Sequence, residues 1–164
     1  MEIELRKRQN RLVDAGVGVI LFAIWSVAKV NLYLGLSMFP IDQLYETADQ
    51  AGINEKFFLA FMITIVAAIL LWQLSTRLYI GLAAVAEGKG KKKGWGYLVL
   101  TAVLLIIDIQ TSWENFIVER ILAGEGLSVN LITGICMEAA AVYAMLELLI
   151  SGIIVKKLRR QMKV

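Results

Sequence analysis

The sequence predicts an all-α fold: a polytopic membrane protein built as a bundle of four transmembrane helices. Of its 164 residues, 59% are hydrophobic, compared with roughly half in soluble domains. The mean hydropathy is +0.69, and the apolar residues are concentrated in long blocks flanked by basic clusters. A helix of about 20 apolar residues is long enough to cross the hydrocarbon core of a bilayer. We therefore expect one transmembrane domain over residues 1–164, without a separate soluble domain.

The apolar blocks predict four spans, at about residues 12–36, 57–86, 95–116 and 129–155. The first block is too long for the apolar region of a signal peptide and lacks a small-residue cleavage site. We therefore interpret it as a permanent first helix. The second block is long enough to tilt or to project beyond the bilayer.

Basic residues predict the orientation, because cationic loops are retained on the cytoplasmic side of a membrane. They precede the first span, separate the second from the third, and follow the fourth: Arg6, Lys7, Arg8, Arg11; Lys89, Lys91, Lys92, Lys93; Lys156, Lys157, Arg159, Arg160 and Lys163. The other two loops are mainly acidic. We expect a multi-pass protein of a cell membrane, such as a bacterial inner membrane, with both termini cytoplasmic.

Each outer loop contains a short stretch with apolar residues at helical spacing. These stretches are PIDQLYETADQAG, residues 40–52, and SWENFIVERILAGEG, residues 112–126. The spacing favours short amphipathic helices at the outer interface over plain polar loops.

Several chemistries are excluded by composition. The chain has no His, so the commonest general base and metal ligand are missing. Cys136 is the only cysteine, and its apolar surroundings indicate a small buried hydrophobe. The stretch EGKGKKKGWG lacks the spacing of a phosphate-binding or dinucleotide-binding loop. We expect no cofactor and no metal. Because the basic residues flank apolar spans, we expect a lipid bilayer as partner and no nucleic acid.

Ionisable residues inside the spans are the candidate functional residues. Lys29 stands in the apolar run FAIWSVAKVNLYLGL, and Asp108 and Glu138 stand in the third and fourth spans. At about 1.5 Å rise per residue, all three lie roughly 18–25 Å from the inner boundary. An unpaired charge there costs at least about 2.5–3.5 kcal/mol, so we expect Lys29 to contact Asp108 or Glu138. The alternatives are that such pairs only fix helix register, or that Lys29 reaches outward to head groups.

A second polar layer is predicted nearer the cytoplasm. Asp14, Arg77 and Glu147 fall about 2–12 Å from the inner boundary, with Glu147 the deepest. Asp14 and Arg77 suit structural ion pairs or contacts with lipid head groups. Ala144, Glu147 and Ser151 share one face of the fourth span, and small residues let helices approach closely in lipid. That helix should be central in the bundle or shared with a second subunit.

The lysines between the second and third spans, Lys91, Lys92 and Lys93, indicate a flexible cytoplasmic turn that enforces topology. They can also attract anionic lipid head groups, at about 1 kcal/mol for each lysine near the surface. We favour the topological role over a specific lipid site.

The function expected from these features is transport. Buried carboxylates and a lysine, Lys29, Asp108, Glu138 and Glu147, suit a pathway for a cation, a proton or a small polar solute. Four helices enclose a narrow path, so a homo-oligomeric channel or transporter is implied. The alternative is a non-catalytic accessory or scaffold protein that binds a partner protein or lipid. An intramembrane enzyme is disfavoured, because the chain shows no recognisable catalytic motif.

Overall fold

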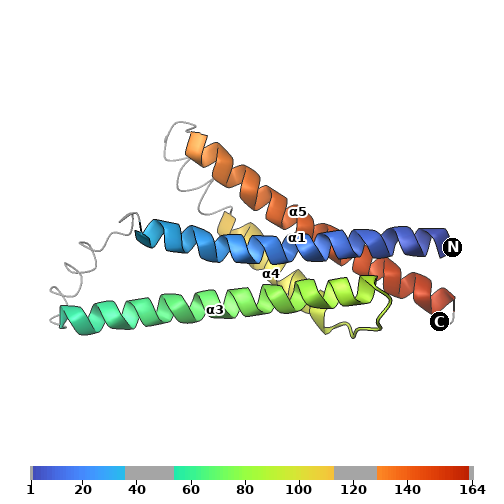
Figure 1. The fold of residues 1–164 in the computed structure, drawn as a ribbon, viewed down its shortest axis with the longest axis horizontal. Coiled ribbons are helices and arrows are strands. Elements are labelled where there is room, and N and C mark those ends of the chain that lie inside the picture. Colours follow the sequence, from blue (N-terminus) through green and yellow to red (C-terminus); the bar gives the residue numbers. More distant parts are fainter. Residues whose placement is uncertain (1, 36–53, 113–128, 163–164) are drawn as a thin grey trace. The chain divides into compact units, whose positions relative to one another are not determined.

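The computed structural model describes residues 2–35, 54–112 and 129–162, and all regular structure in these ranges is α-helical (Figure 1). The helices are α1 (Glu2–Gly35), α3 (Glu55–Gly88), α4 (Gly96–Ser112) and α5 (Val129–Gln161). The predicted all-α class is confirmed for this part of the chain. The interfacial helices expected in the two outer loops fall outside the described residues.

Three of these helices, α1, α3 and α5, are long and apolar enough to cross a membrane. They contain 34, 34 and 33 residues, or about 50 Å at 1.5 Å per residue, compared with about 30 Å of hydrocarbon. All three extend beyond the predicted spans, α1 at its start, α3 slightly at both ends and α5 at its end, because Arg, Lys, Gln and Glu continue a helix readily. The shorter α4 has 17 described residues. These lengths and compositions are compatible with a membrane location.

The helices pack into two compact units. The first unit comprises residues 1–21 and 78–164 and therefore contains the start of α1, the end of α3, and both α4 and α5. The second unit comprises residues 22–77.

The apolar core of the first unit receives side chains from each of the four described helices. Those of α1 are three and four residues apart, and the two alanines of α3 lie three and four residues after Ile80, so one face of each helix is buried. The core consists of Leu12, Ala15 and Val19; Ile80, Ala83 and Ala84; Tyr97, Leu98, Leu104 and Leu105; and Met145, Leu148 and Val155.

Two glycines bring the backbones of α1 and α3 into contact within the first unit. A Cβ atom added to Gly81 would lie 2.7 Å from the carbonyl oxygen of Gly16 and 2.5 Å from Cγ1 of Ile20. A larger residue at either position would separate the helices. This close approach is typical of helix pairs that associate through small residues.

The end of α3 is a tight turn closed by main-chain hydrogen bonds. The N–H of Lys91 bonds to the carbonyl of Ala86, and the N–H of Gly90 to that of Glu87, each at 3.0 Å. Gly90 has a φ of 95°, a conformation that suits glycine. This is the Schellman motif, which satisfies the last carbonyls of a helix.

The basic segments of the chain meet at one end of the first unit. The start of α1 and the last turns of α5 lie beside the end of α3 (Figure 1). A Cβ added to Gly88 would lie 2.7 Å from the carbonyl oxygen of Gln9, and Arg159 donates to the carbonyl of Glu87 at 2.8 Å.

The second unit contains residues 22–35 of α1 and residues 54–77. The side chain of Asn54 caps α3 by accepting bonds from the N–H groups of Lys56 and Phe57, at 3.1 and 3.4 Å. Large apolar side chains of α3 are exposed in this unit: Phe57, Phe61, Ile63, Ile65, Ile69, Leu71 and Trp72. Exposed apolar surface of this extent is unusual for a soluble monomer and matches a helix whose surroundings are lipid or another subunit.

Candidate functional site

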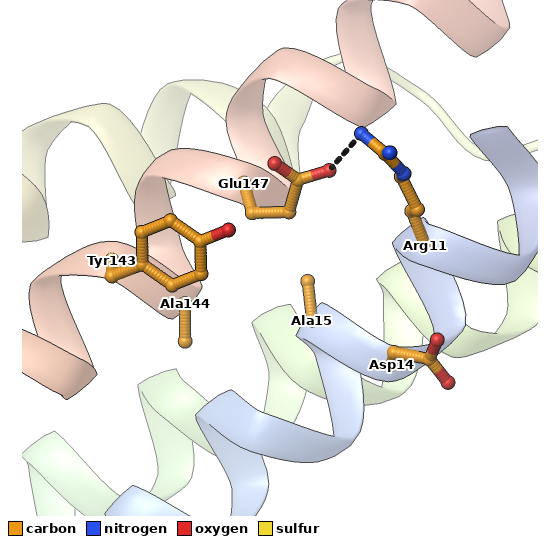
Figure 2. Close-up of a pocket in the computed structure, with 6 residues that line it drawn as sticks. All are labelled: Arg11, Asp14, Ala15, Tyr143, Ala144 and Glu147. Atoms are coloured by element: carbon orange, nitrogen blue, oxygen red, sulfur yellow. Dashed lines mark ion pairs between the residues drawn. The ribbon is translucent and has the colours of Figure 1, made fainter.

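An open pocket between α1 and α5 in the first unit is the candidate site (Figure 2). Its volume is about 440 Å³, and it is lined by Arg11, Asp14 and Ala15 of α1 and by Tyr143, Ala144 and Glu147 of α5. One turn farther along α1, a Cβ added to Gly18 would lie 3.5 Å from Cβ of Ala144. The two helices are therefore in close contact next to the pocket.

An ion pair crosses the pocket. Nη1 of Arg11 lies 3.8 Å from Oε1 of Glu147, and their side chains are 48% and 21% exposed. This distance exceeds that of a hydrogen bond, so the attraction is electrostatic and partly screened by solvent. The same oxygen of Glu147 accepts a hydrogen bond from the hydroxyl of Ser151 at 2.9 Å. Ser151, one helical turn later on α5, thus orients the carboxylate.

The remaining polar side chains of the pocket are Asp14 and Tyr143. Asp14 is exposed on α1, three residues after Arg11, and the hydroxyl of Tyr143 is turned toward the space between the helices (Figure 2). Two carboxylates, one guanidinium and one phenol therefore line the pocket. These groups suit a cation, or a small solute with both positive and negative groups.

The pocket brings together two of the predicted site residues. Asp14 and Glu147 were placed in one layer from their depths along the spans, and both line the pocket. Arg11 was assigned only to the basic segment that sets topology, although it is the cation paired with Glu147. Arg77, the third member of the predicted layer, is buried in the second unit.

The deeper predicted layer is distributed between the two units. Asp108 and Glu138 are half-buried residues of the first unit, on α4 and α5. Lys29 is half-buried on the part of α1 that belongs to the second unit. A contact of Lys29 with either carboxylate stays a prediction.

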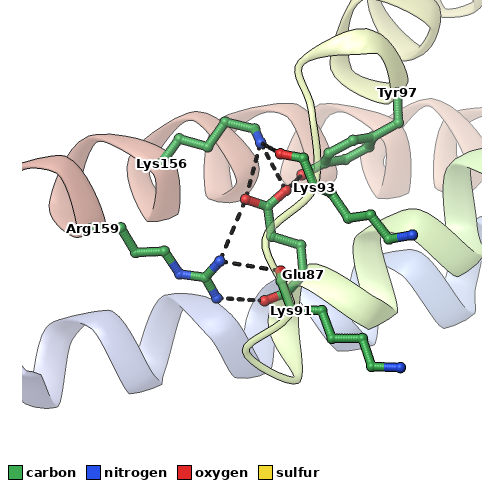
Figure 3. A network of polar contacts seen from close by, with 6 residues as sticks. All are labelled: Glu87, Lys91, Lys93, Tyr97, Lys156 and Arg159. Atoms are coloured by element: carbon green, nitrogen blue, oxygen red, sulfur yellow. Dashed lines mark hydrogen bonds and ion pairs between the residues drawn. The ribbon is translucent and has the colours of Figure 1, made fainter. Parts of the chain in front are cut away.

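A second polar cluster surrounds Glu87 at the end of α3 (Figure 3). Glu87 is only 1% exposed. Its Oε2 accepts a hydrogen bond from the hydroxyl of Tyr97 at 2.7 Å. The ammonium of Lys156 donates to Oε1 at 3.0 Å, and Nη1 of Arg159 lies 3.8 Å from the same oxygen.

The two cations of this cluster also bind main-chain carbonyls. Arg159 donates to the carbonyls of Glu87 and Lys91, at 2.8 and 3.2 Å. Lys156 donates to the carbonyl of Lys93 and lies 5.4 Å from the ring centroid of Tyr97. Every buried side-chain nitrogen and oxygen of the described residues has a hydrogen-bond partner. Because its charges are internally paired and shielded from solvent, we interpret the cluster as structural.

Sequence reasoning missed this cluster. Lys156 and Arg159 were assigned to topology together with their basic neighbours, and Glu87 was not singled out. One signal was present in the sequence: Glu87 is the only acidic residue in the segment 87–93, which contains four lysines. Lys156 and Arg159, three residues apart, also share one face of a helix.

Two further expectations concern the lysine turn and the cysteine. Lys91, Lys92 and Lys93 are exposed, but the turn that carries them is anchored to α5 through its carbonyls. Cys136 was expected to be buried and is exposed. The buried face of α5 includes Ala141, Met145 and Leu148 instead. An apolar run shows that a helix is apolar on all sides, but it does not show which side is covered.

No protein-family model, curated protein or solved structure matches this chain.

Proposed function

We propose that this protein is a multi-pass membrane protein that forms a homo-oligomeric channel or transporter for a cation, a proton or a small polar solute. The observation that carries the proposal is the open pocket containing Arg11, Asp14 and Glu147. These residues belong to α1 and α5, which are both long and apolar enough to cross a membrane. Ionisable groups in such helices commonly mark solute or ion pathways.

The pairing of Glu147 supports exchange with a mobile cation. Its contact with Arg11 is 3.8 Å long, and Arg11 is about half exposed. An entering cation can therefore replace Arg11 as the partner of the Glu147 carboxylate, and the Arg11 guanidinium is then hydrated by solvent. Asp14 supplies a second carboxylate on the facing helix. Lys29, Asp108 and Glu138, which the sequence places deeper in the spans, are the proposed continuation of the path.

The exposed apolar surface supports assembly into oligomers. The most apolar 18-residue window of α3 has 0% of its residues buried, so this surface is open to lipid or to a second copy of the chain. A homo-oligomer would also enlarge the path, because four helices enclose little space between them. We propose a cytoplasmic location for the basic end of the first unit, in agreement with the retention of cationic segments on that side.

The test is flux through proteoliposomes containing the purified protein, measured with dyes sensitive to K⁺ and to pH. Glu147→Gln and Glu138→Gln remove one carboxylate each without changing side-chain shape, and both are expected to lose most of the flux. Glu4→Gln is the matched control, because Glu4 is an exposed carboxylate near the start of α1 and should leave flux unchanged.

Two results would contradict the transport proposal. One is the absence of flux in the parent protein for every ion and small solute tested. The other is equal flux in the parent protein and in both variants. Either result would favour the non-catalytic accessory or scaffold role.

A further inference from the structure

The turn between α3 and α4 presents its main chain inward and its lysines outward. The carbonyl of Lys91 accepts a hydrogen bond from Arg159, and the carbonyl of Lys93 accepts one from Lys156. The ammonium groups of Lys91 and Lys93 point away from the Glu87 cluster (Figure 3). Lys92, between them, is also exposed.

The shape of this turn is held at both ends as well as in its middle. It begins with the Schellman motif, in which Gly90 has its φ of 95°. It ends where the carbonyl of Trp95 accepts bonds from the N–H groups of Leu98 and Val99, at 2.9 and 3.1 Å. The lysines therefore stand on an ordered support, which lowers the entropy lost when they bind a ligand.

The exposed charged side chains on this turn and on the adjoining end of α5 are all positive. Residues 87–93 and 156–160 contain eight Lys or Arg residues and one acidic residue, Glu87. The net charge of the whole chain is only +3, so the excess is local. Because Glu87 is 1% exposed and already paired with Lys156 and Arg159, it does not neutralise the outer lysines. The complementary partner is an anion.

Trp95 indicates where this anion lies. It lies two residues after Lys93, is 59% exposed, and has the ammonium of Lys156 at 5.4 Å from its ring centroid. An exposed tryptophan at the start of an apolar helix is typical of the head-group level of a bilayer. In a bilayer, this position of Trp95 would place the lysines at the height of lipid phosphates.

We propose that residues 89–95 form a docking surface for the head-group phosphates of anionic phospholipids. Lys91, Lys92 and Lys93 provide the charge, and Trp95 inserts beside the glycerol backbone. The lipid occupies the leaflet on the basic side of the first unit. This inference rests on the membrane location proposed above and does not depend on transport.

The test is a lipid titration of the purified full-length chain in neutral detergent, with bound lipids counted by native mass spectrometry. Phosphatidylglycerol and phosphatidylcholine with the same acyl chains are compared. Phosphatidylglycerol is expected to bind more tightly. The variant K91Q/K92Q/K93Q should lose this preference by about fivefold for each ammonium group removed, or about a hundredfold in total.

This variant leaves the support intact, because the turn contacts α5 through main-chain carbonyls that glutamine also has. The matched control is R6Q/K7Q/R8Q, which removes three positive charges from the start of α1 in the same unit. It should retain the preference for phosphatidylglycerol. Far-ultraviolet circular dichroism checks that both variants are folded.

Four results would overturn the proposal. They are no preference in the parent protein, no loss in K91Q/K92Q/K93Q, an equal loss in R6Q/K7Q/R8Q, and complete displacement of the lipid by millimolar inorganic phosphate. The third would indicate attraction by total charge, and the fourth a site for small free anions. A protein that shows no flux but a local lipid preference would refute transport alone.

Discussion

The ammonium group of Lys156 lies 3.0 Å from each carboxylate oxygen of Glu87, although the two residues are 69 positions apart in the chain. The two side chains are 10% and 2% exposed. The hydroxyl of Tyr97 binds the same carboxylate, so this group joins α3, α4 and α5. The first unit therefore has a charged connection at its basic end in addition to its apolar core.

Removing the charge of Glu87 should destabilise the first unit strongly. In Glu87→Gln, Lys156 and Arg159 stay largely buried without their counter-ion, and breaking a buried pair in this way costs about 3–5 kcal/mol. We expect about 3 kcal/mol, because both cations keep some contact with solvent. The measurement is the free energy of unfolding in detergent, followed by circular dichroism.

The control for this prediction is an exposed ion pair. Glu2 and Arg6 are 2.9 Å apart, with side chains about three-quarters exposed. Glu2→Gln should therefore change the free energy of unfolding by no more than about 0.5 kcal/mol. If both substitutions had equally small effects, the Glu87 cluster would not stabilise the fold.

Tyr97→Phe tests the phenolic hydrogen bond. The substitution keeps the buried ring and removes the hydroxyl that donates to Glu87 at 2.7 Å. A hydrogen bond to a charged group contributes about 1.5–3 kcal/mol, and we expect a loss of unfolding free energy in that range. In the double variant with Glu87→Gln, the additional loss should be smaller, because the charged acceptor is already gone. Strictly additive losses would contradict coupling between the two residues.

Gly81→Ala tests the contact between α1 and α3. The new Cβ would meet the carbonyl oxygen of Gly16 at 2.7 Å and Cγ1 of Ile20 at 2.5 Å. Since backbone cannot move aside as a side chain can, we expect a loss of about 1–3 kcal/mol. Gly94→Ala is the control, because nothing lies within 4 Å of the added atom. Unchanged thermal stability in Gly81→Ala would show that the helices are farther apart.

Substitutions of Gly90 test the conformation of the turn that contains the lysines. Its φ of 95° is unfavourable for a residue with a Cβ, by about 1–2 kcal/mol. Gly90→Ala should lower the unfolding free energy by that amount, and Gly90→Asn by less, because asparagine tolerates left-handed backbone. The added atom meets nothing within 4 Å, so the effect is purely conformational. Equal stability of Gly90→Ala and the parent protein would contradict this conformation.

The helices could be predicted from the sequence because the interactions that form them are local. Long apolar blocks predicted α1, α3 and α5, and the start of α5 at Val129 coincides with the predicted start of the fourth span. Backbone hydrogen bonds within a helix satisfy its own polar groups. A long apolar block therefore has few alternatives to helix, whatever lies beside it.

The candidate pocket could be predicted from the sequence only in part. Counting the rise per residue placed Asp14 and Glu147 in one layer, and both line the pocket. Depth along a helix says nothing about rotation around its axis, so the partner of Glu147 could not be identified. Arg11 takes that position, although its basic neighbours had suggested only a topological role.

Composition and charge distribution alone predicted the long apolar helices that the structure describes, with basic residues gathered beside them, since these properties belong to each segment separately. Tertiary packing decided that Glu87 would be the buried charge, that Lys156 and Arg159 would neutralise it, and that the lysines of the turn would remain outside. These outcomes depend on which helix faces meet, and residues 69 positions apart carry no local signal that they will be neighbours.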